Sequence, residues 1–392
     1  MRISEIVVYQ LDLPLAAPYR LSGGRLLFER LDATLVRVET DEGVHGWGEA
    51  YTLTGREQAL DRMIQDFGTC VVGRDPFHIK QFTQAMWRDV SIKRGGFDFY
   101  CALSGLELAM WDIVGKIAKQ PVYNLLGGPC RDRIRIYAHP DGEGTLAERC
   151  QRLIDRGITA IKFDPFPGPW NAIVERDVEE TAVERVREVR EAVGPKVELL
   201  IEVHRRLAPM HAVRVAKAIQ QYDVFWYEEP TPAENLDATA EVRSKIDIPV
   251  VAGEALYAKA DFRNCFEKRA ADIINPDICN VGGLLEIKEI AAMAEPYCVA
   301  VAPHGNNSTT VGLAASVQAA AVMPNFLIME YFVGWEAAAN EVARNPIQVD
   351  GDKIKLLEEP GLGIELDEAA LERYPYRGGR QRTLRGPADE RP

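Results

Sequence analysis

Short apolar runs alternate with amphipathic stretches from about residue 130 to residue 331. Eight of these runs are six to eight residues long, nearly all apolar and bounded by polar residues, which is typical of strands buried on both faces. They cover residues 134–139, 159–164, 197–204, 224–229, 249–254, 272–277, 298–304 and 326–331. The stretches between them, such as ERVREVREAV and AVRVAKAIQQY, have apolar residues at helical spacing. Eight strand-plus-helix units of about 25 residues predict a parallel (β/α)8-type barrel. An open doubly wound sheet is disfavoured, because no strand is followed by G-x-G-x-x-G or by a P-loop.

The two ends of the chain follow other patterns. Residues 3–49 are rich in β-branched residues and carry a DEG turn signal, which predicts a hairpin of strands. Residues 57–125 show helical spacing, so the first 125 residues are expected to form an α+β unit. After residue 335, strand-like IQVDGDKIKL precedes a polar end that we expect to pack back on the N-terminal unit. The expected boundaries are 1–125, 126–335 and 336–392.

Composition narrows the class of protein. Apolar residues make up 47% and charged residues 27% of the chain, as in ordinary globular proteins, so bulk disorder is excluded. The formal net charge is −13 and there is no basic stripe, so we expect no binding to nucleic acid or to membranes. Seven scattered cysteines without C-x-x-C spacing indicate a reducing compartment. Because the first residues also lack a signal-peptide pattern, a cytoplasmic location is expected.

Ionisable residues end the predicted strands from the second strand onward. They are Asp164, Glu202 with His204, Glu228 with Glu229, Glu254, Asp277, His304 and Glu330. From the third strand onward they recur every 23 to 27 residues, which is one strand-plus-helix unit. The C-terminal ends of barrel strands surround one mouth, where the active sites of barrel enzymes lie. These side chains are therefore expected to converge.

Three of these acids, Glu202, Glu228 and Glu254, end adjacent predicted strands. Carboxylates that converge in a partly buried mouth repel one another unless a proton or a cation lies between them. Oxygen ligands without cysteine suit a hard divalent ion, so we expect Mg2+, with Mn2+ as the second choice. Strand alternation puts only one of Glu228 and Glu229 in the mouth, and the spacing does not decide which.

Two histidines complete the candidate chemistry. Asp277 and His304 end neighbouring predicted strands, where the carboxylate can bind one imidazole nitrogen and make the other a general base. By strand alternation, His204 shares the face of Glu202. It is therefore expected to face the same cavity.

Taken in order, the motifs resemble the enolase superfamily, in its mandelate racemase-like subgroup of acid-sugar dehydratases. They are SGLELAMWDIVGKIAKQPVYNLLGG, IKFDPF, IEVH, WYEEP, VAGEALY, NPDICNVGG, APHG, MEY and PGLGIELDE, and they extend over nearly the whole chain. The resemblance implies a modified (β/α)7β barrel with an α+β capping domain, built from the N-terminal segment and the C-terminal tail. It also implies a required Mg2+ and abstraction of a proton α to a carboxylate. We expect a small carboxylate substrate and a homo-oligomer.

The resemblance also implies roles for single residues. The implied metal ligands are Glu202, Glu228 and Glu254. His304 and Asp277 match the general-base pair of the family. Glu202-x-His204 resembles the Asp-x-His of galactonate-type dehydratases, in which the histidine is the general acid. Glu330 matches the acid of the last strand and, if held protonated, would donate a hydrogen bond to the charge that develops on the substrate.

Two positions depart from the family pattern. The first ligand is Glu202 rather than the commoner aspartate. The second strand reads Lys162-Phe163-Asp164 where racemases of the subgroup carry Lys-x-Lys, so a Lys/His pair of bases is incomplete. Lys162 is still expected to neutralise the substrate carboxylate. Further expected substrate contacts are Asp164, Glu229 and Arg20, and residues 19–30 and 91–100, with Arg25 and Lys93, are expected to act as lids.

The expected reaction is the Mg2+-dependent dehydration of an aldonate or aldarate to its 2-keto-3-deoxy derivative. His304 would remove the α-proton, and His204 would protonate the departing β-hydroxyl. An epimerase or racemase, or a cycloisomerase of a sugar acid, would use the same enolate chemistry and stays open as the alternative. A two-carboxylate glycosidase would leave the His304–Asp277 pair unused. A protein that only binds a carboxylate would leave most of the strand-end groups without a purpose.

Overall fold

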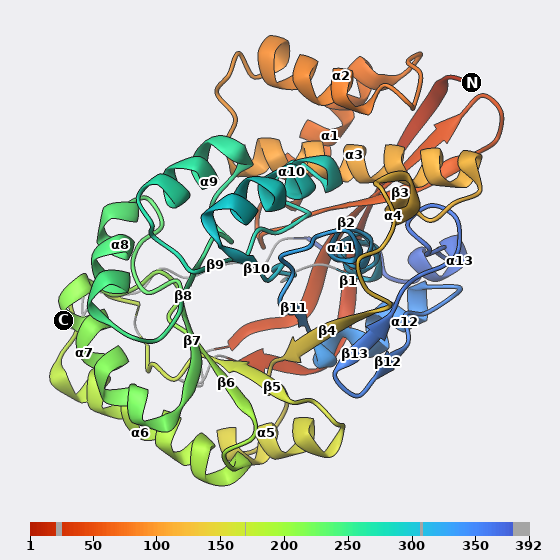
Figure 1. Cartoon of the computed structure of the whole chain (residues 1–392). Coiled ribbons are helices and arrows are strands. Elements are labelled where there is room, and N and C mark those ends of the chain that lie inside the picture. Colours follow the sequence, from red (N-terminus) through yellow and green to blue (C-terminus); the bar gives the residue numbers. More distant parts are fainter. Residues whose placement is uncertain (21–25, 169, 306–308, 379–392) are drawn as a thin grey trace.

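A computed structural model gives the fold, and it describes residues 1–20, 26–168, 170–305 and 309–378 (Figure 1). Among these residues, eight parallel strands form a ring. In chain order they are β4 (Arg133–Ala138), β5 (Ala160–Phe163), β6 (Glu198–Glu202), β7 (Val224–Glu228), β8 (Val250–Ala252), β9 (Ile273–Ile274), β10 (Ala300–Val301) and β11 (Met329–Tyr331). All eight lie within the predicted runs, apart from the first residue of β4.

The ring closes because its first and last strands are neighbours. Strands β4 to β10 pair in order along the sheet, and β11 pairs with β4, with Glu330 opposite Tyr137. On its other side, the backbone N–H of Leu327 donates to the carbonyl of Val301 at 2.8 Å, which joins the segment before β11 to β10. The strands are shorter than the apolar runs, although single backbone hydrogen bonds between neighbouring segments continue toward the mouth, as from the N–H of Arg205 to the carbonyl of Glu229 at 2.7 Å. The backbone turns into the left-handed region just after β6, with φ of 57° at His204.

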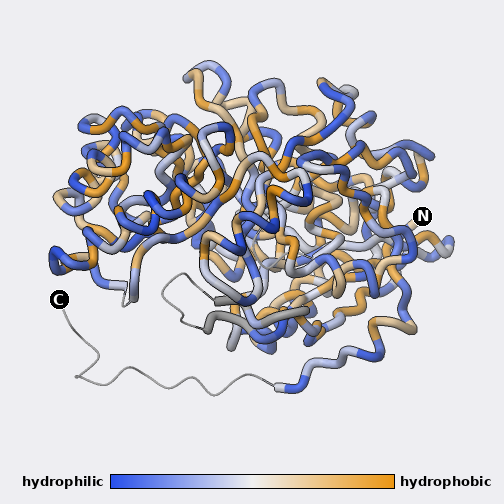
Figure 2. The backbone as a smooth tube through the Cα atoms, turned by 90° about the horizontal axis from the view of Figure 1, so that it is seen from below, coloured by the Kyte–Doolittle hydropathy of each residue, from blue (hydrophilic) through white to orange (hydrophobic). Residues whose placement is uncertain are grey.

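Helices between consecutive strands cover the outside of the ring (Figure 1). The seven that link the strands are α5 (Leu146–Asp155), α6 (Arg176–Val193), α7 (Pro209–Ile219), α8 (Leu236–Lys245), α9 (Ala258–Glu267), α10 (Leu284–Ala294) and α11 (Thr310–Ala321), and η2 (Gln220–Tyr222) and η3 (Glu295–Tyr297) extend two of them. Apolar residues recur at helical spacing, as in α6, where Ala182, Val186 and Val189 are buried. Figure 2 shows the resulting alternation of hydrophobic and hydrophilic residues along the chain. Eight strands and seven helices confirm the expected (β/α)7β barrel.

The N-terminal segment forms the expected α+β unit, called the capping domain below. Its antiparallel sheet contains β1 (Ile3–Arg20), β2 (Leu26–Thr40) and β3 (His45–Ala50), and its helices are α1 (Glu57–Val71), α2 (Ile79–Ala85), η1 (Met86–Val90), α3 (Phe97–Ala118) and α4 (Val122–Leu125). Helix α3 lies directly on β3. A Cβ atom at Gly48 would come within 1.9 Å of the carbonyl oxygen of Gly105, so only glycine allows this approach.

The C-terminal segment contacts both parts of the chain. It contains η4 (Val333–Trp335), α12 (Glu336–Val342), β12 (Val349–Asp350), β13 (Lys353–Lys355) and α13 (Glu368–Leu371). Strand β13 pairs antiparallel with β4 of the barrel. The chain then returns to the capping sheet, where the N–H of Asp12 donates to the carbonyl of Tyr374 at 3.0 Å. The tail thus contacts the capping sheet as far as Tyr376, whose N–H donates to the carbonyl of Gln10 at 3.2 Å, while the boundaries 1–125, 126–335 and 336–392 stay a prediction.

The described helices include none with the length and apolar character needed to cross a membrane.

Candidate active site

Three glutamates from adjacent strands converge at the C-terminal mouth of the barrel. Glu202 and Glu228 are the last residues of β6 and β7 and stand opposite each other in the sheet, and Glu254 follows β8. One carboxylate oxygen of each lies within 4.8 Å of the others. Asn275 joins two of them, because its side chain donates to Glu228 Oε1 at 3.0 Å and accepts from the N–H of Glu254 at 3.0 Å. The structure therefore brings the three predicted ligands together.

The chemistry of this cluster fits a divalent cation. Glu228 is fully buried, and its Oε2 atom has no hydrogen-bond partner among the described residues. Burial and the neighbouring Glu202 carboxylate raise the pKa of Glu228 well above its usual range, which means that its charge is poorly compensated by the protein alone. An unpartnered buried oxygen in a set of three carboxylates is suited to a hard cation such as Mg2+.

Lys162 of β5 lies beside Glu228 and is 1% exposed. Its Nζ is 2.6 Å from Glu228 Oε1, 2.7 Å from Glu330 Oε1 and 3.5 Å from Glu202 Oε2. Burial alone would lower the pKa of this ammonium group, but the charges of Glu228 and Glu330 outweigh burial and raise the pKa well above its usual range. Lys162 is thus a permanently charged group that links the triad to Glu330.

Glu330, at the centre of β11, is held as a carboxylate. Besides Lys162, its Oε1 lies 2.7 Å from His139 Nε2, and its Oε2 accepts from the N–H of Gly305 at 2.8 Å. Burial favours the neutral acid, but the charges of Lys162 and His304 are stronger and hold the pKa of Glu330 well below its usual range. The hydrogen bond from Glu330 to the substrate was expected only if this acid is protonated, and the two charges beside it favour the carboxylate instead.

His304 and Asp277 form a buried pair at the ends of β10 and β9. His304 Nδ1 lies 2.7 Å from Asp277 Oδ2, and the other oxygen of Asp277 accepts from the N–H of Cys279 at 2.8 Å. The second ring nitrogen of His304 faces the mouth, 3.2 Å from Glu254 Oε2. Burial lowers the pKa of His304, but the charge of Glu330 and the hydrogen bond to Asp277 outweigh it and raise the pKa. The geometry matches the arrangement expected of a general base and its orienting carboxylate.

A second histidine–aspartate pair lies on the β5–β6 side of the triad. His204 Nδ1 is 3.0 Å from Asp164 Oδ2, and the backbone N–H of His204 donates to Glu202 Oε1 at 2.7 Å. The ring of Trp170 stacks on His204 with 5.0 Å between centroids. Arg206, which is buried, also donates to Asp164 Oδ2 and lies 5.1 Å from the Trp170 ring. His204 reaches this place through its left-handed backbone turn rather than through strand alternation.

Two of the expected substrate contacts, Asp164 and Glu229, are also bonded within the protein, and their contact with a substrate stays a prediction. Both oxygens of Asp164 accept from protein donors, since Oδ1 accepts from the N–H of Phe166 at 2.9 Å and Oδ2 lies beside His204 and Arg206. Glu229 is buried and accepts from the N–H of Gly253 at 2.8 Å, which fixes the residue before Glu254.

The loop predictions are only partly covered by the described residues. Arg20 ends β1, but its side chain lies outside the described part of the structure, as does Arg25 altogether. Residues 19–30 are in part the end of the long β1–β2 hairpin rather than a simple loop. Lys93 is exposed between η1 and α3, and Arg205 forms an ion pair with Glu254. The lid function of both segments stays a prediction.

Three further residues of the site, His139, Asn275 and Trp170, were not predicted from the sequence. His139 follows the first barrel strand, so the rule applied to the other strand ends would have found it. Its ring also stacks on Phe332 at 4.2 Å. Asn275 follows β9 and is polar at the same rim, whereas Trp170 lies in a connection without any signal in the local sequence.

Family models and relatives of known name match most of this chain. A family model for the mandelate racemase / muconate lactonizing enzyme N-terminal domain matches residues 4–127, and one for the enolase C-terminal domain-like region matches residues 145–370. A D-galactonate dehydratase of Variovorax paradoxus (strain S110) is 34% identical over 344 residues, which cover 86% of this chain and 89% of the relative. A D-xylonate dehydratase of Haloferax volcanii is 34% identical over 360 residues, covering 88% of this chain and 85% of the relative.

Solved structures give the same result. A mandelate racemase/muconate lactonizing enzyme-like protein from Roseovarius sp. TM1035 superimposes with a TM-score of 0.88 and 34% identity, over 96% of each chain. A mandelate racemase/muconate lactonizing enzyme from Jannaschia sp. CCS1 gives a TM-score of 0.87 and 31% identity, over 97% of this chain and 99% of that chain. This chain therefore belongs to the mandelate racemase/muconate lactonizing enzyme family of the enolase superfamily.

Proposed function

We propose that this chain is a Mg2+-dependent acid-sugar dehydratase, a hydro-lyase that converts an aldonate or aldarate to its 2-keto-3-deoxy derivative. The observation that carries the proposal is the pair of histidines flanking the glutamate triad. His304, with Asp277, contacts Glu254 at one end of the triad, and His204, with Asp164, contacts Glu202 at the other. Relatives with the names D-galactonate and D-xylonate dehydratase support the same class of reaction.

Dehydration of a sugar acid needs a base for the α-proton and an acid for the β-hydroxyl. Glu202, Glu228 and Glu254 would hold Mg2+, which when bound supplies positive charge for the substrate carboxylate as it becomes an enediolate. His304 takes the α-proton on Nε2, because Asp277 holds the other ring nitrogen. His204 gives a proton to the departing β-hydroxyl, which leaves as water. The enol that remains becomes the 2-keto-3-deoxy acid.

Lys162 and Glu330 set the charge beside these histidines. The buried ammonium group of Lys162 offsets the negative charge of Glu228 and Glu330, and so limits the repulsion that an incoming carboxylate would meet. Glu330 fixes the N–H of Gly305, which adjoins His304. We propose that both groups position the reacting residues rather than exchange protons with the substrate.

An epimerase or racemase is the second candidate, because two histidines on two flanks could also remove and return a proton at one carbon. A cycloisomerase would likewise start from the same enolate. Both alternatives conserve the mass of the substrate, whereas dehydration releases water. Mass spectrometry of the product therefore separates them from the dehydratase.

The test is a screen of a library that contains all stereoisomers of the aldonates and aldarates. Each compound is incubated with the protein and Mg2+, and formation of a 2-keto acid is measured. For any substrate that reacts, His304→Asn should abolish exchange of the α-proton with D2O. His204→Asn should block formation of the keto acid while exchange continues. Full exchange in the His304 variant would exclude His304 as the base, and keto acid formation at the wild-type rate in the His204 variant would exclude His204 as the acid.

A further inference from the structure

We infer that Glu49 of the capping domain is a positioning residue for the general base, because its carboxylate anchors the start of the helix that follows His304. This inference rests on the proposed role of His304. It assigns to the capping domain a function in the chemistry of the barrel, separate from any contact with the substrate.

Glu49 is the second-last residue of β3 and is fully buried. Its Oε1 accepts from the N–H of Thr309 at 2.6 Å, and its Oε2 accepts from the Thr309 hydroxyl at 2.8 Å and from the N–H of Gly312 at 2.7 Å. These groups form the beginning of α11, whose first N–H groups have no partner within the helix. A carboxylate from the other domain thus replaces the local N-cap that α11 lacks, since Thr309 makes no side-chain cap bond.

The anchored helix begins close to the base in the sequence. Thr309 follows His304 by five residues, and Gly305 is bound by the Glu330 carboxylate. The chain after His304 is therefore fixed by the barrel at Gly305 and by the capping domain at Thr309.

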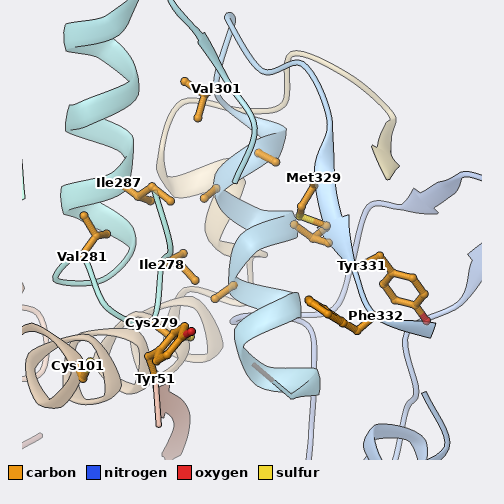
Figure 3. Close-up of a cluster of buried hydrophobic side chains, with 14 of the residues drawn as sticks. Tyr51, Cys101, Ile278, Cys279, Val281, Ile287, Val301, Met329, Tyr331 and Phe332 are labelled. Carbon is orange, nitrogen blue, oxygen red and sulfur yellow. The ribbon is translucent and has the colours of Figure 1, made fainter. Parts of the chain in front are cut away.

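Tyr51, which directly follows β3, contacts the segment after Asp277, the partner of His304. The N–H of Tyr51 donates to the carbonyl of Cys279 at 3.1 Å, and the N–H of Cys279 donates to Asp277. The Tyr51 ring stacks on the His304 ring, with 6.2 Å between centroids and 22° between planes. Figure 3 shows Tyr51 next to Cys279 within the buried cluster that lies between the two domains. Residues 49–51 therefore contact both elements that carry the base pair.

A second carboxylate of the capping domain repeats this arrangement on the other element. Glu107 of α3 is buried and accepts from the N–H groups of Leu284 and Leu285 at 2.8 and 3.0 Å, at the start of α10. Helix α10 is the one that follows Asp277. The glycine before it has φ of 95°, and a Cβ atom there would lie 2.1 Å from the Glu107 carboxylate, so the contact needs Gly283. Two buried acids of one domain thus fix the two helices after the base pair.

The acceptor must be a carboxylate with two oxygens. A glutamine at position 49 would keep one acceptor and place an NH2 group against an N–H donor, which leaves a buried donor unpaired. Glu49→Gln should therefore displace the start of α11 while changing few atoms. Because misplacing a reacting group by about 1 Å can cost roughly 100-fold in rate, a clear loss of proton transfer is expected.

The experiment compares Glu49→Gln with Asp112→Asn at pH 8, using the full chain with Mg2+ and a sugar acid turned over by the wild type. Asp112 is the control, because it is also fully buried and accepts from the N–H groups of Trp47 in β3 and of Leu362. It also pairs with Lys116, and among the described residues none of these partners belongs to α10 or α11. Exchange of the α-proton with D2O should fall about 100-fold in Glu49→Gln and stay within threefold of wild type in Asp112→Asn. KM should change less than the exchange rate.

A second readout does not depend on activity. In chains with 15N-labelled histidine, the Nδ1–H signal of the His304–Asp277 hydrogen bond, assigned with His304→Asn, should shift or broaden in Glu49→Gln and stay in place in Asp112→Asn. If Glu49→Gln does not fold, Thr309→Val replaces it in the experiment, because it removes the hydroxyl donor to Glu49. The exchange rate and the NMR signal should then change in the same direction but by less. An unmoved signal together with wild-type exchange would overturn the inference. A wild type that exchanges no sugar acid would instead overturn the proposed function, and the NMR signal would still decide the role of Glu49.

Discussion

Replacing Lys162 with methionine removes one buried positive charge and keeps most of the side-chain volume. In the wild type, Nζ lies 2.6 Å from Glu228 and 2.7 Å from Glu330, and it also faces the Tyr137 ring at 5.1 Å. Methionine can fill the space against this ring, but the two carboxylates then lose their counter-charge. The substitution therefore tests charge compensation at the site rather than packing.

The magnitude follows from Coulomb's law and from desolvation. At an effective dielectric constant of about 20, the contact of Lys162 with the Glu330 carboxylate contributes roughly 6 kcal/mol of attraction, and the contact with Glu228 contributes as much when Glu228 is ionised. The cost of desolvating the ammonium group offsets several kcal/mol of this attraction. Breaking a buried ion pair typically lowers the free energy of unfolding by about 3–5 kcal/mol. At about 2.1 cal/mol/K per residue, a chain of this length should lose about 4–6 °C in unfolding temperature.

The assay is thermal unfolding of both chains in a buffer with chelator, followed by the same scan with Mg2+. Without divalent cation, Lys162→Met should unfold about 4–6 °C below wild type. Added Mg2+ should narrow this difference, because a cation at the triad compensates part of the same negative charge. Lys116→Met is the matched control, since Lys116 pairs with Asp112 and Glu365 far from the triad, and its difference from wild type should not respond to Mg2+. A Lys162 variant that unfolds within 1 °C of wild type would refute the compensation of Glu228 and Glu330 by this ammonium group.

His139→Leu removes the ring nitrogen that contacts Glu330, so kcat should fall about tenfold with little change in KM. His139→Gln keeps an N–H group at a similar position and should retain more activity than His139→Leu. Equal kcat values for the two variants would count against this role of His139. Trp170→Leu removes the ring stacked on His204, so keto acid formation should slow while α-proton exchange continues, and loss of both together would contradict it. Burial outweighs the backbone donors of Glu49 and raises its pKa from 4.5 to about 7. Between pH 4.5 and about 7 the folded chain therefore binds more protons than the unfolded chain. The free energy of unfolding should decline as pH rises through this range. Calorimetry should show a shallower decline for Glu49→Gln, and an unchanged slope would show that Glu49 is not the group responsible.

The positions of the strands and the converging acids could be predicted from the sequence because they depend on local patterns. Each buried strand is an apolar run, and its last polar residue lies at the mouth by the geometry of a parallel barrel. The convergence of Glu202, Glu254 and one of Glu228 and Glu229 follows from this rule, whereas the choice of Glu228 came from the family resemblance. His139 follows from it as well, once the first strand is included.

Other features depend on contacts between distant segments. The ionised state of Glu330 results mainly from Lys162 of β5 and from His304, which follows β10, so no local pattern gives its charge. The position of His204 results from a left-handed turn after β6 that strand alternation does not include. Capping of α11 by Glu49 joins residues 260 positions apart, and a buried acid in a capping strand has no local signal for such a contact.

The central claim is that three glutamates hold one divalent cation beside His304, and calorimetric titration with Mg2+ tests it most directly. Wild type should bind one Mg2+ per chain. Glu228→Gln should weaken binding by at least about 100-fold, since it replaces a direct ligand, whereas Glu229→Gln, whose side chain is turned to Gly253, should bind nearly as well as wild type. Equal affinity in wild type and Glu228→Gln would contradict the claim.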